Sequence, residues 1–236
     1  MTRLLFSSPG ACGIALLLAV AGGMLAGRGR AVAQAATPAA DPAALSRQLA
    51  RRALDALHRG ADAATREAQL AAYREGLALA QQAIEADESN ADAHFAAFAN
   101  RGRLVELEGM TINPLALWKL QRDLNRALAL NPAHPDALAA KGRMCSRLPR
   151  WLGGNREQAV EYLSRAHQLD PNDVGVLIDL AEAYRDSGHP ERSVPLLEQA
   201  VALATAAGDA DQLAAARGLL REFTPSPGVA PSASQE

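Results

Sequence analysis

Apolar residues recur at spacings of three and four along residues 41–222, which is the period of an α-helix with one buried face. Gly, Pro and Asn interrupt this pattern at regular intervals, and no run shows the alternation of a β-strand. The pattern therefore predicts an all-α fold. We expect nine helices, at about 41–58, 62–86, 90–108, 114–130, 135–147, 155–168, 172–187, 190–206 and 210–222.

Local signals mark the ends of several of these helices. Asp41 and Asn113 each precede a proline, a pair typical of a helix cap followed by the first helical position. Gly60 is expected to end the first helix, and Asp62 to cap the second.

The chain repeats a helix-ending pattern. ALNPAHPDAL at 129–138 aligns with QLDPNDVGVL at 168–177, and ADESNADAH at 86–94 is a third copy with Glu88 in place of proline. The clearest unit is 174–203, in which large and small residues alternate where two helices must approach closely. Its signature positions, with the preceding Pro171, are Leu177, Leu180, Ala181, Tyr184, Gly188, Pro190, Ser193, Leu197 and Ala200.

This spacing resembles the tetratricopeptide repeat (TPR). The resemblance implies a short solenoid of tetratricopeptide-like helical hairpins, an α-α superhelix. Extra residues at 148–153 and around 103–113 imply enlarged corners between the helices of a pair. With these inserts, residues 65–205 also resemble the periplasmic T component of TRAP transporters and the regulator-of-microtubule-dynamics family. That narrower resemblance implies a pore that binds an apolar ligand or a solute-receptor protein.

The corner LPRWLGGNREQA at 148–159 contains no reactive group. Asn155 is expected to cap the following helix, with Gln158 as its capping-box partner, and Gly153 and Gly154 to permit the turn. We expect Trp151 to anchor the corner on a neighbouring helix.

The first 35 residues have the pattern of a secretory signal peptide: a positive start, the apolar stretch 11–26, and small-residue cleavage sites. Its removal takes three arginines and changes the formal net charge from −2 to −5. Residues 36–40 are expected to be a linker, 41–222 the helical domain, and 223–236 a disordered tail. The predicted location is periplasmic, or envelope-anchored if the segment is retained.

The sequence offers no catalytic constellation, metal-ligand spacing or phosphate loop, so we expect a non-enzyme without cofactor or metal. His134 and His189 are expected at exposed corners, and Cys145 as a buried small hydrophobe. Trp118 is expected in the core or lining an inner cavity. The charge gives no indication of nucleic-acid binding.

TPR-like hairpins bind partners through the inner face of their first helices, which together form a concave surface. The repeat register places six candidate partner-binding residues there: Phe95, Ala139, Arg143, Ile178, Glu182 and Arg185. An anionic group could pair with Arg143 or Arg185. The alternative is that these residues are solvated or paired internally, as Glu182 with Arg185.

We therefore predict an exported scaffold or adaptor that binds a protein or peptide in its concave groove. The alternative function is binding of an apolar small molecule for a transport system. Membrane association is expected only if the N-terminal segment is not cleaved.

Overall fold

The computed structural model describes residues 41–108 and 113–223, and these contain nine α-helices, two short 3₁₀ helices and no strand. The predicted signal peptide, linker and tail beyond residue 223 lie outside the described residues. The chain divides into two units, 1–39 and 40–236, and every described helix belongs to the second. The helices are α1 (Pro42–Asp62), α2 (Arg66–Ala86), α3 (Ala91–Leu107), α4 (Pro114–Leu130), α5 (Pro135–Arg147), η1 (Arg150–Leu152), α6 (Arg156–Leu169), α7 (Val174–Asp186), η2 (Pro190–Arg192), α8 (Ser193–Ala207) and α9 (Ala210–Phe223).

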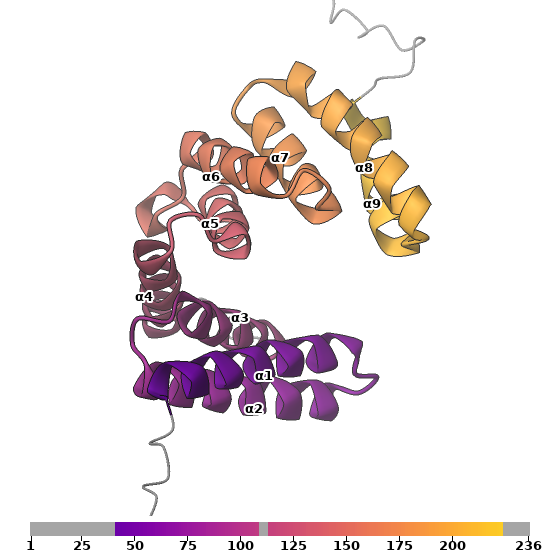
Figure 1. Cartoon of the computed structure of the whole chain (residues 1–236). Helices are drawn as coiled ribbons and strands as arrows, with labels where there is room; N and C mark the ends of the chain where they lie inside the picture. Colours follow the sequence, from indigo (N-terminus) through magenta and orange to yellow (C-terminus); the bar gives the residue numbers. More distant parts are fainter. Residues whose placement is uncertain (1–40, 109–112, 224–236) are drawn as a thin grey trace, which may run out of the picture. The chain divides into compact units, whose positions relative to one another are not determined.

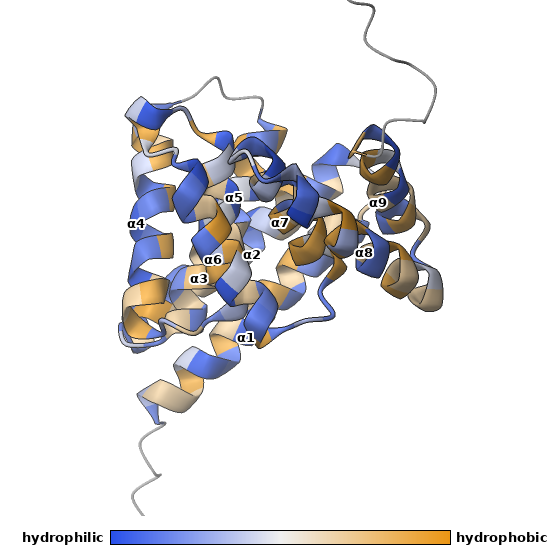
Figure 2. Ribbon diagram, turned by 90° about the horizontal axis from the view of Figure 1, so that it is seen from above, coloured by the Kyte–Doolittle hydropathy of each residue, from blue (hydrophilic) through white to orange (hydrophobic). Residues whose placement is uncertain are grey.

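Each helix packs against the next one along the chain (Figure 1). The first helices of neighbouring pairs also meet in three places, where α1 contacts α3, α5 contacts α7, and α7 contacts α9. This arrangement is the all-α solenoid of tetratricopeptide-like hairpins that the repeat pattern predicted. Figure 2 shows hydrophobic and hydrophilic positions alternating along the helices, as amphipathic helices in a thin layered fold require.

The helix caps predicted from a capping residue followed by proline are confirmed at Asp41 and Asn113. The Asp41 carboxylate accepts from the backbone N–H of Ala43 at 3.0 Å, and the Asn113 side chain accepts from that of Leu115 at 2.9 Å. In both cases proline occupies the first helical position, where its missing N–H costs nothing.

The expected end of the first helix at Gly60 is wrong. Helix α1 continues to Asp62, and Thr65, not Asp62, caps α2. Gly60 is buried against Tyr73 of α2, so close to the ring that a Cβ at this position would overlap it. The glycine therefore allows close packing of two helices instead of ending one.

The 174–203 unit has the packing that its pattern predicted. Leu177 and Leu197 are fully buried, and Gly188 adopts a left-handed φ of +88° in the turn. The Ser193 hydroxyl donates to the carbonyl of Ala181 at 2.6 Å and ties α8 to α7. Burying each such leucine stabilises the domain by about 1.5–3 kcal/mol.

The enlarged corner between α5 and α6 is held by its backbone. Gly153 has a φ of +97°, and a Cβ on the buried Gly154 would overlap the carbonyl of Leu148. The N–H of Asn155 donates to the Cys145 carbonyl at 2.9 Å, and its side chain caps α6 by accepting from the N–H of Gln158 at 3.0 Å. The turn and the Asn155 cap are as predicted, but the Asn155 N–H pairs with Cys145 and not with the Gln158 side chain that the predicted capping box requires.

The expected role of Trp151 as the anchor of this corner is wrong, because its side chain is 79% exposed. The contact with α4 comes instead from Gln121, whose Nε2 donates to the Leu152 carbonyl at 3.1 Å. Trp118 is not in the core either: it is 54% exposed, and the guanidinium of Arg122 lies 5.4 Å from its ring centroid.

Candidate binding groove

An apolar groove of about 640 Å³ lies between α3, α4 and α5. We call it the apolar groove. Its walls come from hydrophobic positions of all three helices, while charged side chains stand at its edge. The apolar lining is Leu57, Phe95, Phe98, Ala99, Val105, Leu117, Leu120, Ala140, Met144 and Leu148, with Gly102 between them; the charged lining is Arg103, Glu106, Arg143 and Arg147.

The end of this groove is built on Phe95, which is 8% exposed and packs with Leu124 of α4 and Ala140 of α5. The rings of Phe95 and Phe98 lie with centroids 6.1 Å apart, within the range of favourable aromatic pairs. The buried His134 lies 4.8 Å from Phe95 on its other side. Phe95 is thus both a core residue and part of the groove wall.

A second, charged pocket of about 250 Å³ shares an edge with the apolar groove. Arg143 and Arg147 line both spaces. The Arg143 guanidinium donates to the carboxylate of Asp179 on α7 at 3.0 Å. The whole lining of this charged pocket is Arg143, Ser146, Arg147, Asp179, Glu182, Arg185 and Asp186.

Burial changes the acidity of two carboxylates in the charged pocket. It raises the pKa of Asp179, although the positive charge of Arg143 opposes the effect. Burial and the neighbouring Asp179 charge both raise the pKa of Glu182. The pocket therefore holds two carboxylates that accept a proton more readily than exposed ones.

The structure brings four of the six candidate residues to these two spaces. Phe95 lines the apolar groove, Arg143 lines both, and Glu182 and Arg185 line the charged pocket. Arg185 is already engaged: it donates to Asp186 at 2.9 Å and reaches Glu222 of α9 at 3.4 Å.

The other two candidates line neither space. Ala139 is 3% exposed and packs with Leu138, Ala166 and Val176 between helices. Ile178 packs against the core cluster of α7, α8 and α9. On α5 the residues that line the two spaces are Ala140, Arg143, Met144, Ser146 and Arg147, so the repeat register placed Arg143 on this face but not Ala139.

Arg147 is a groove residue that the sequence reasoning missed. It is exposed and makes no hydrogen bond or ion pair with another described residue. Its position four residues after Arg143 places it on the same side of α5, and this spacing was a signal that could have identified it.

The histidines and the cysteine are structural in the described part of the chain. His134 is buried, contrary to the expected exposed corner, and its Nε2 lies 3.3 Å from the Asp92 carboxylate. His189 is exposed as expected, and Cys145 is buried. No group of three His, Cys, Asp or Glu side chains in residues 41–108 and 113–223 could hold a metal ion.

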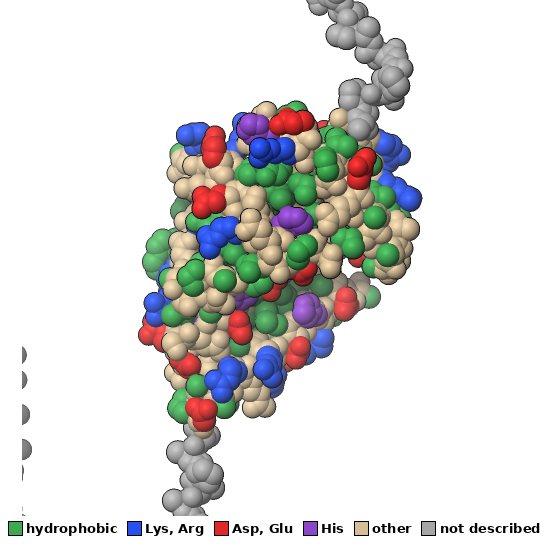
Figure 3. All heavy atoms as spheres, turned by 45° about the horizontal axis from the view of Figure 1, so that its top comes forward, with side chains coloured by type: hydrophobic (Ala, Val, Ile, Leu, Met, Phe, Trp, Pro, Cys, Tyr) green, Lys and Arg blue, Asp and Glu red, His purple; other side chains and the backbone are tan. Residues whose placement is uncertain are grey.

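None of the described helices is both long and apolar enough to cross a membrane. On the face shown in Figure 3, hydrophobic side chains are interspersed with charged ones and do not form one continuous patch.

Comparison with known proteins supports the repeat assignment. The tetratricopeptide repeat family matches residues 152–220, which span α6 to α9. No curated protein matches the chain. Among solved structures, MamA is 17% identical and YrrB, a TPR protein with an unusual peptide-binding site, is 16% identical. The MamA match covers 67% of this chain and 88% of that one with a TM-score of 0.43; the YrrB match covers 62% and 84% with a TM-score of 0.36.

The thermophilic TPR protein TTC0263 of Thermus thermophilus is 15% identical, covers 74% of this chain and 93% of its own, and has a TM-score of 0.45. The helical hairpins define the class of molecule as an all-α solenoid, and its residues 152–220 match the tetratricopeptide repeat family. Such solenoids commonly act as binding scaffolds for proteins and peptides.

Proposed function

We propose that the protein is a non-catalytic scaffold, exported from the cytoplasm, that binds a protein or peptide segment in the apolar groove. The observation that carries this proposal is the continuity between the apolar groove and the arginine-lined edge of the charged pocket. An apolar side chain of a partner would fit against Phe98, Leu117 and Met144. A carboxylate of the same partner would reach Arg147.

Arg147 is the best-placed residue for this contact because it is exposed and has no ion-pair partner within 4.0 Å among the described residues, although its charge also acts on the carboxylates of Asp179 and Glu182. Arg143 already pairs with Asp179, and Arg185 with Asp186 and Glu222. The proposed partner is therefore a segment with apolar residues and at least one acidic side chain or a terminal carboxylate. Opposite charges across the edge of an interface favour fast and selective association.

Selection of peptides from a random library on the purified protein tests the proposal. The selected peptides should combine apolar residues with a carboxylate, and calorimetry should give a measurable Kd. Arg147→Glu should weaken binding roughly tenfold or more, since it replaces an attractive charge with a repulsive one.

Arg52→Glu is the matched control, because Arg52 is exposed on α1, lines neither space and has no ion pair within the described residues. It makes the same change of charge and should leave the Kd unchanged. Selected peptides that bind the Arg147→Glu protein as tightly as the unsubstituted one would refute the proposed site, and so would a library that yields no binder.

The second candidate function is binding of an apolar small molecule for a transport system. The volume of the apolar groove favours it, since ligand pockets commonly measure about 300–1,000 Å³. Native mass spectrometry separates the two functions. A tightly retained mass of lipid size would favour the small molecule, while a protein without such a mass that binds the selected peptides favours the scaffold.

Export is proposed from the N-terminal sequence, which carries a positive start, an apolar stretch and small residues before position 36. N-terminal sequencing of the protein from a cell-envelope fraction tests it. A mature end near Gln34 or Ala36 supports secretion, and an intact Met1 indicates a retained anchor.

A further inference from the structure

The chain has two tryptophans, and both are exposed in one region of the fold. Trp118 lies on α4 and Trp151 on η1. The Gln121 side chain, one turn after Trp118, donates to the carbonyl of Leu152, the residue after Trp151. This hydrogen bond holds the two tryptophan-bearing segments against each other.

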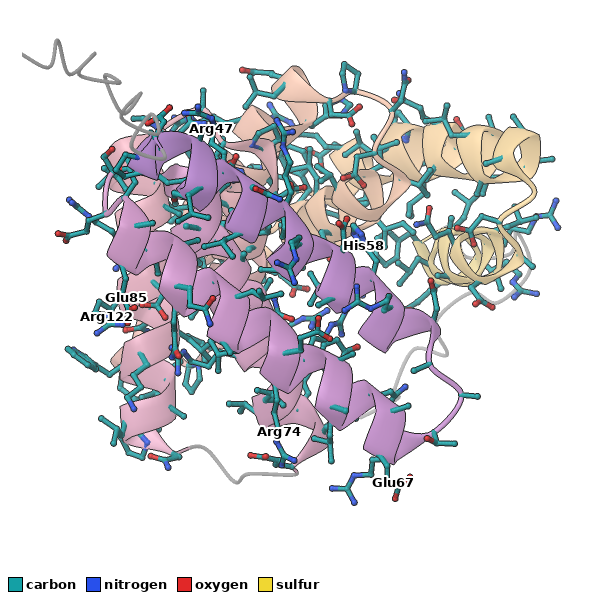
Figure 4. All side chains as sticks on the ribbon, turned by 60° about the horizontal axis from the view of Figure 1, so that its bottom comes forward. Arg47, His58, Glu67, Arg74, Glu85 and Arg122 are labelled. Carbon is teal, nitrogen blue, oxygen red and sulfur yellow. The ribbon has the colours of Figure 1, made fainter. Side chains whose placement is uncertain are left out.

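The exposed side chains of α4 lie on the opposite side of the helix from the apolar groove. At 100° per residue, Leu117, Leu120 and Leu124 lie on one face. Leu115, Trp118 and Arg122 lie on the other. Leu115 is 58% exposed, and Figure 4 shows Arg122 at the outer side of α4. This outer surface is therefore distinct from the binding groove.

Positive side chains adjoin both tryptophans: the half-buried Lys119 follows Trp118 in the sequence, and the exposed Arg150 precedes Trp151. We call the group the corner patch: Leu115, Trp118, Lys119, Arg122, Arg150 and Trp151. Lys119 and Arg150 make no ion pair with a described residue, and the Arg122 guanidinium lies over the ring of Trp118.

The acidic groups near the corner patch offset part of this charge, and they include Glu85 of α2, which Figure 4 shows beside Arg122. Asp123 is buried beneath Arg122 and is shared with Arg101 of α3, so two arginines face one carboxylate. Glu88 pairs with Arg126, which lies further along the outer face of α4. Glu157 and Arg156 follow each other at the start of α6 and balance one another. The net charge of the corner patch is thus positive in a chain whose total formal charge is −2.

We propose that the corner patch docks the protein on an anionic membrane surface. Tryptophan concentrates at the level of lipid headgroups, where its ring is buried and its N–H remains hydrated. Lysine and arginine beside it extend toward acidic headgroups, and several such charges act together. Both tryptophans protrude from the protein, so they are the inserting groups, and the charge around them selects an anionic surface.

Because these are the only tryptophans in the chain, intrinsic fluorescence reports on the corner patch directly. Vesicles of phosphatidylglycerol and phosphatidylcholine should shift the emission of the purified protein to shorter wavelength, while pure phosphatidylcholine should not. Trp118→Phe and Trp151→Phe each leave one reporter, and both should show the shift. The N-terminal apolar segment contains no tryptophan, so the emission comes from the corner patch, and the mature protein without residues 1–35 should show the same shift.

Charge reversal at Arg150 distinguishes docking through the corner patch from a general electrostatic attraction between the protein and the vesicle. Arg150→Glu should weaken vesicle binding roughly tenfold or more, on the basis of about fivefold for each charge near the surface. Arg52→Glu carries the same change on α1 and should bind as the unsubstituted protein does.

Three outcomes would overturn the proposal: emission that anionic vesicles do not change, an equal shift with neutral vesicles, or equal weakening by Arg150→Glu and Arg52→Glu. A partner protein that is lost on Trp151→Ala, with no vesicle-induced shift, would assign the corner patch to protein docking instead. Peptide binding in the apolar groove is unaffected by any of these results.

Discussion

Gly142 of α5 lies directly against Leu163 of α6: a Cβ on the glycine would be 2.5 Å from the leucine Cγ. Leu163 is fully buried and cannot swing away. Gly142→Ala should therefore destabilise the domain by about 1–3 kcal/mol through overpacking, as measured by chemical denaturation.

Gly218→Ala in α9 is the matched control, because a Cβ there meets no atom within 4 Å. It should leave stability unchanged or raise it by up to about 1 kcal/mol, since alanine is the better helix former. A Gly142→Ala protein as stable as Gly218→Ala would show that α5 and α6 are further apart than the structure places them.

The sequence was sufficient for features that depend on neighbouring residues. Caps such as Asp41 and Asn155 and the turn at Gly153 follow from local backbone chemistry, and the 174–203 register follows from its large and small residues. These signals give the all-α hairpin architecture without reference to distant contacts.

Features set by contacts between distant segments could not be predicted in the same way. Gly60 has the sequence context of a helix end, but the ring of Tyr73 makes it a packing glycine. The exposure of Trp151 depends on how η1 meets α4, which no local pattern encodes. The repeat register predicts Ala139 and Arg143 on one face of α5, but only Arg143 lines the two spaces, because Ala139 packs in the layer between helices with Ala166 and Val176.

The buried carboxylate of Asp123 joins α3 and α4. It accepts from the mostly buried Arg101 at 3.3 Å and from the exposed Arg122 at 2.6 Å. Asp123→Ala should cost about 3 kcal/mol or more, because it leaves Arg101 partly buried without a counter-charge. Arg122→Ala should cost less than about 1 kcal/mol, since that arginine is solvated. Thermal denaturation of both variants measures the two losses of stability. Equal losses would contradict the prediction that Asp123→Ala is the more damaging substitution.

Two aspartates should give opposite pH dependences of stability. The pKa of Asp179 is raised by burial, so its charged form disfavours folding at neutral pH, and this cost is relieved as the pH falls through its raised pKa toward the ordinary 3.8. The stability advantage of the unsubstituted protein over Asp179→Asn should therefore increase as the pH falls toward 3.8. Urea denaturation at several pH values measures it.

For Asp92 the pH dependence of the stability contribution has the opposite sign. The His134 imidazole, whose Nε2 lies 3.3 Å from the carboxylate, lowers the pKa of Asp92, so the contribution of Asp92 to stability is present above the ordinary value of 3.8 and is lost as the pH falls through the lowered pKa. The advantage over Asp92→Asn should shrink below pH 3.8. If the stability advantage over Asp179→Asn and the advantage over Asp92→Asn changed in the same direction with pH, the environment of one of these two aspartates would be misassigned.

Cys145 should be inert in the folded protein. Its side chain is buried, and burial raises the pKa of the thiol, so little thiolate forms near neutral pH. Alkylation by iodoacetamide, followed for the Cys145 peptide by mass spectrometry, should require unfolding. Rapid labelling without denaturant would indicate that the α5–α6 pair opens locally.

Gly154, and not Trp151, should determine the stability of the enlarged corner. A Cβ on Gly154 would overlap the Leu148 carbonyl, and a backbone atom has no rotamer by which to move aside. Gly154→Ala should therefore cost about 3 kcal/mol or more, at the upper end of single substitutions. Trp151→Ala removes an exposed ring and should change stability by less than about 0.5 kcal/mol. Calorimetric melting compares the two, and a large loss in Trp151→Ala would mean that the ring packs against the domain and that the corner patch is not free to dock.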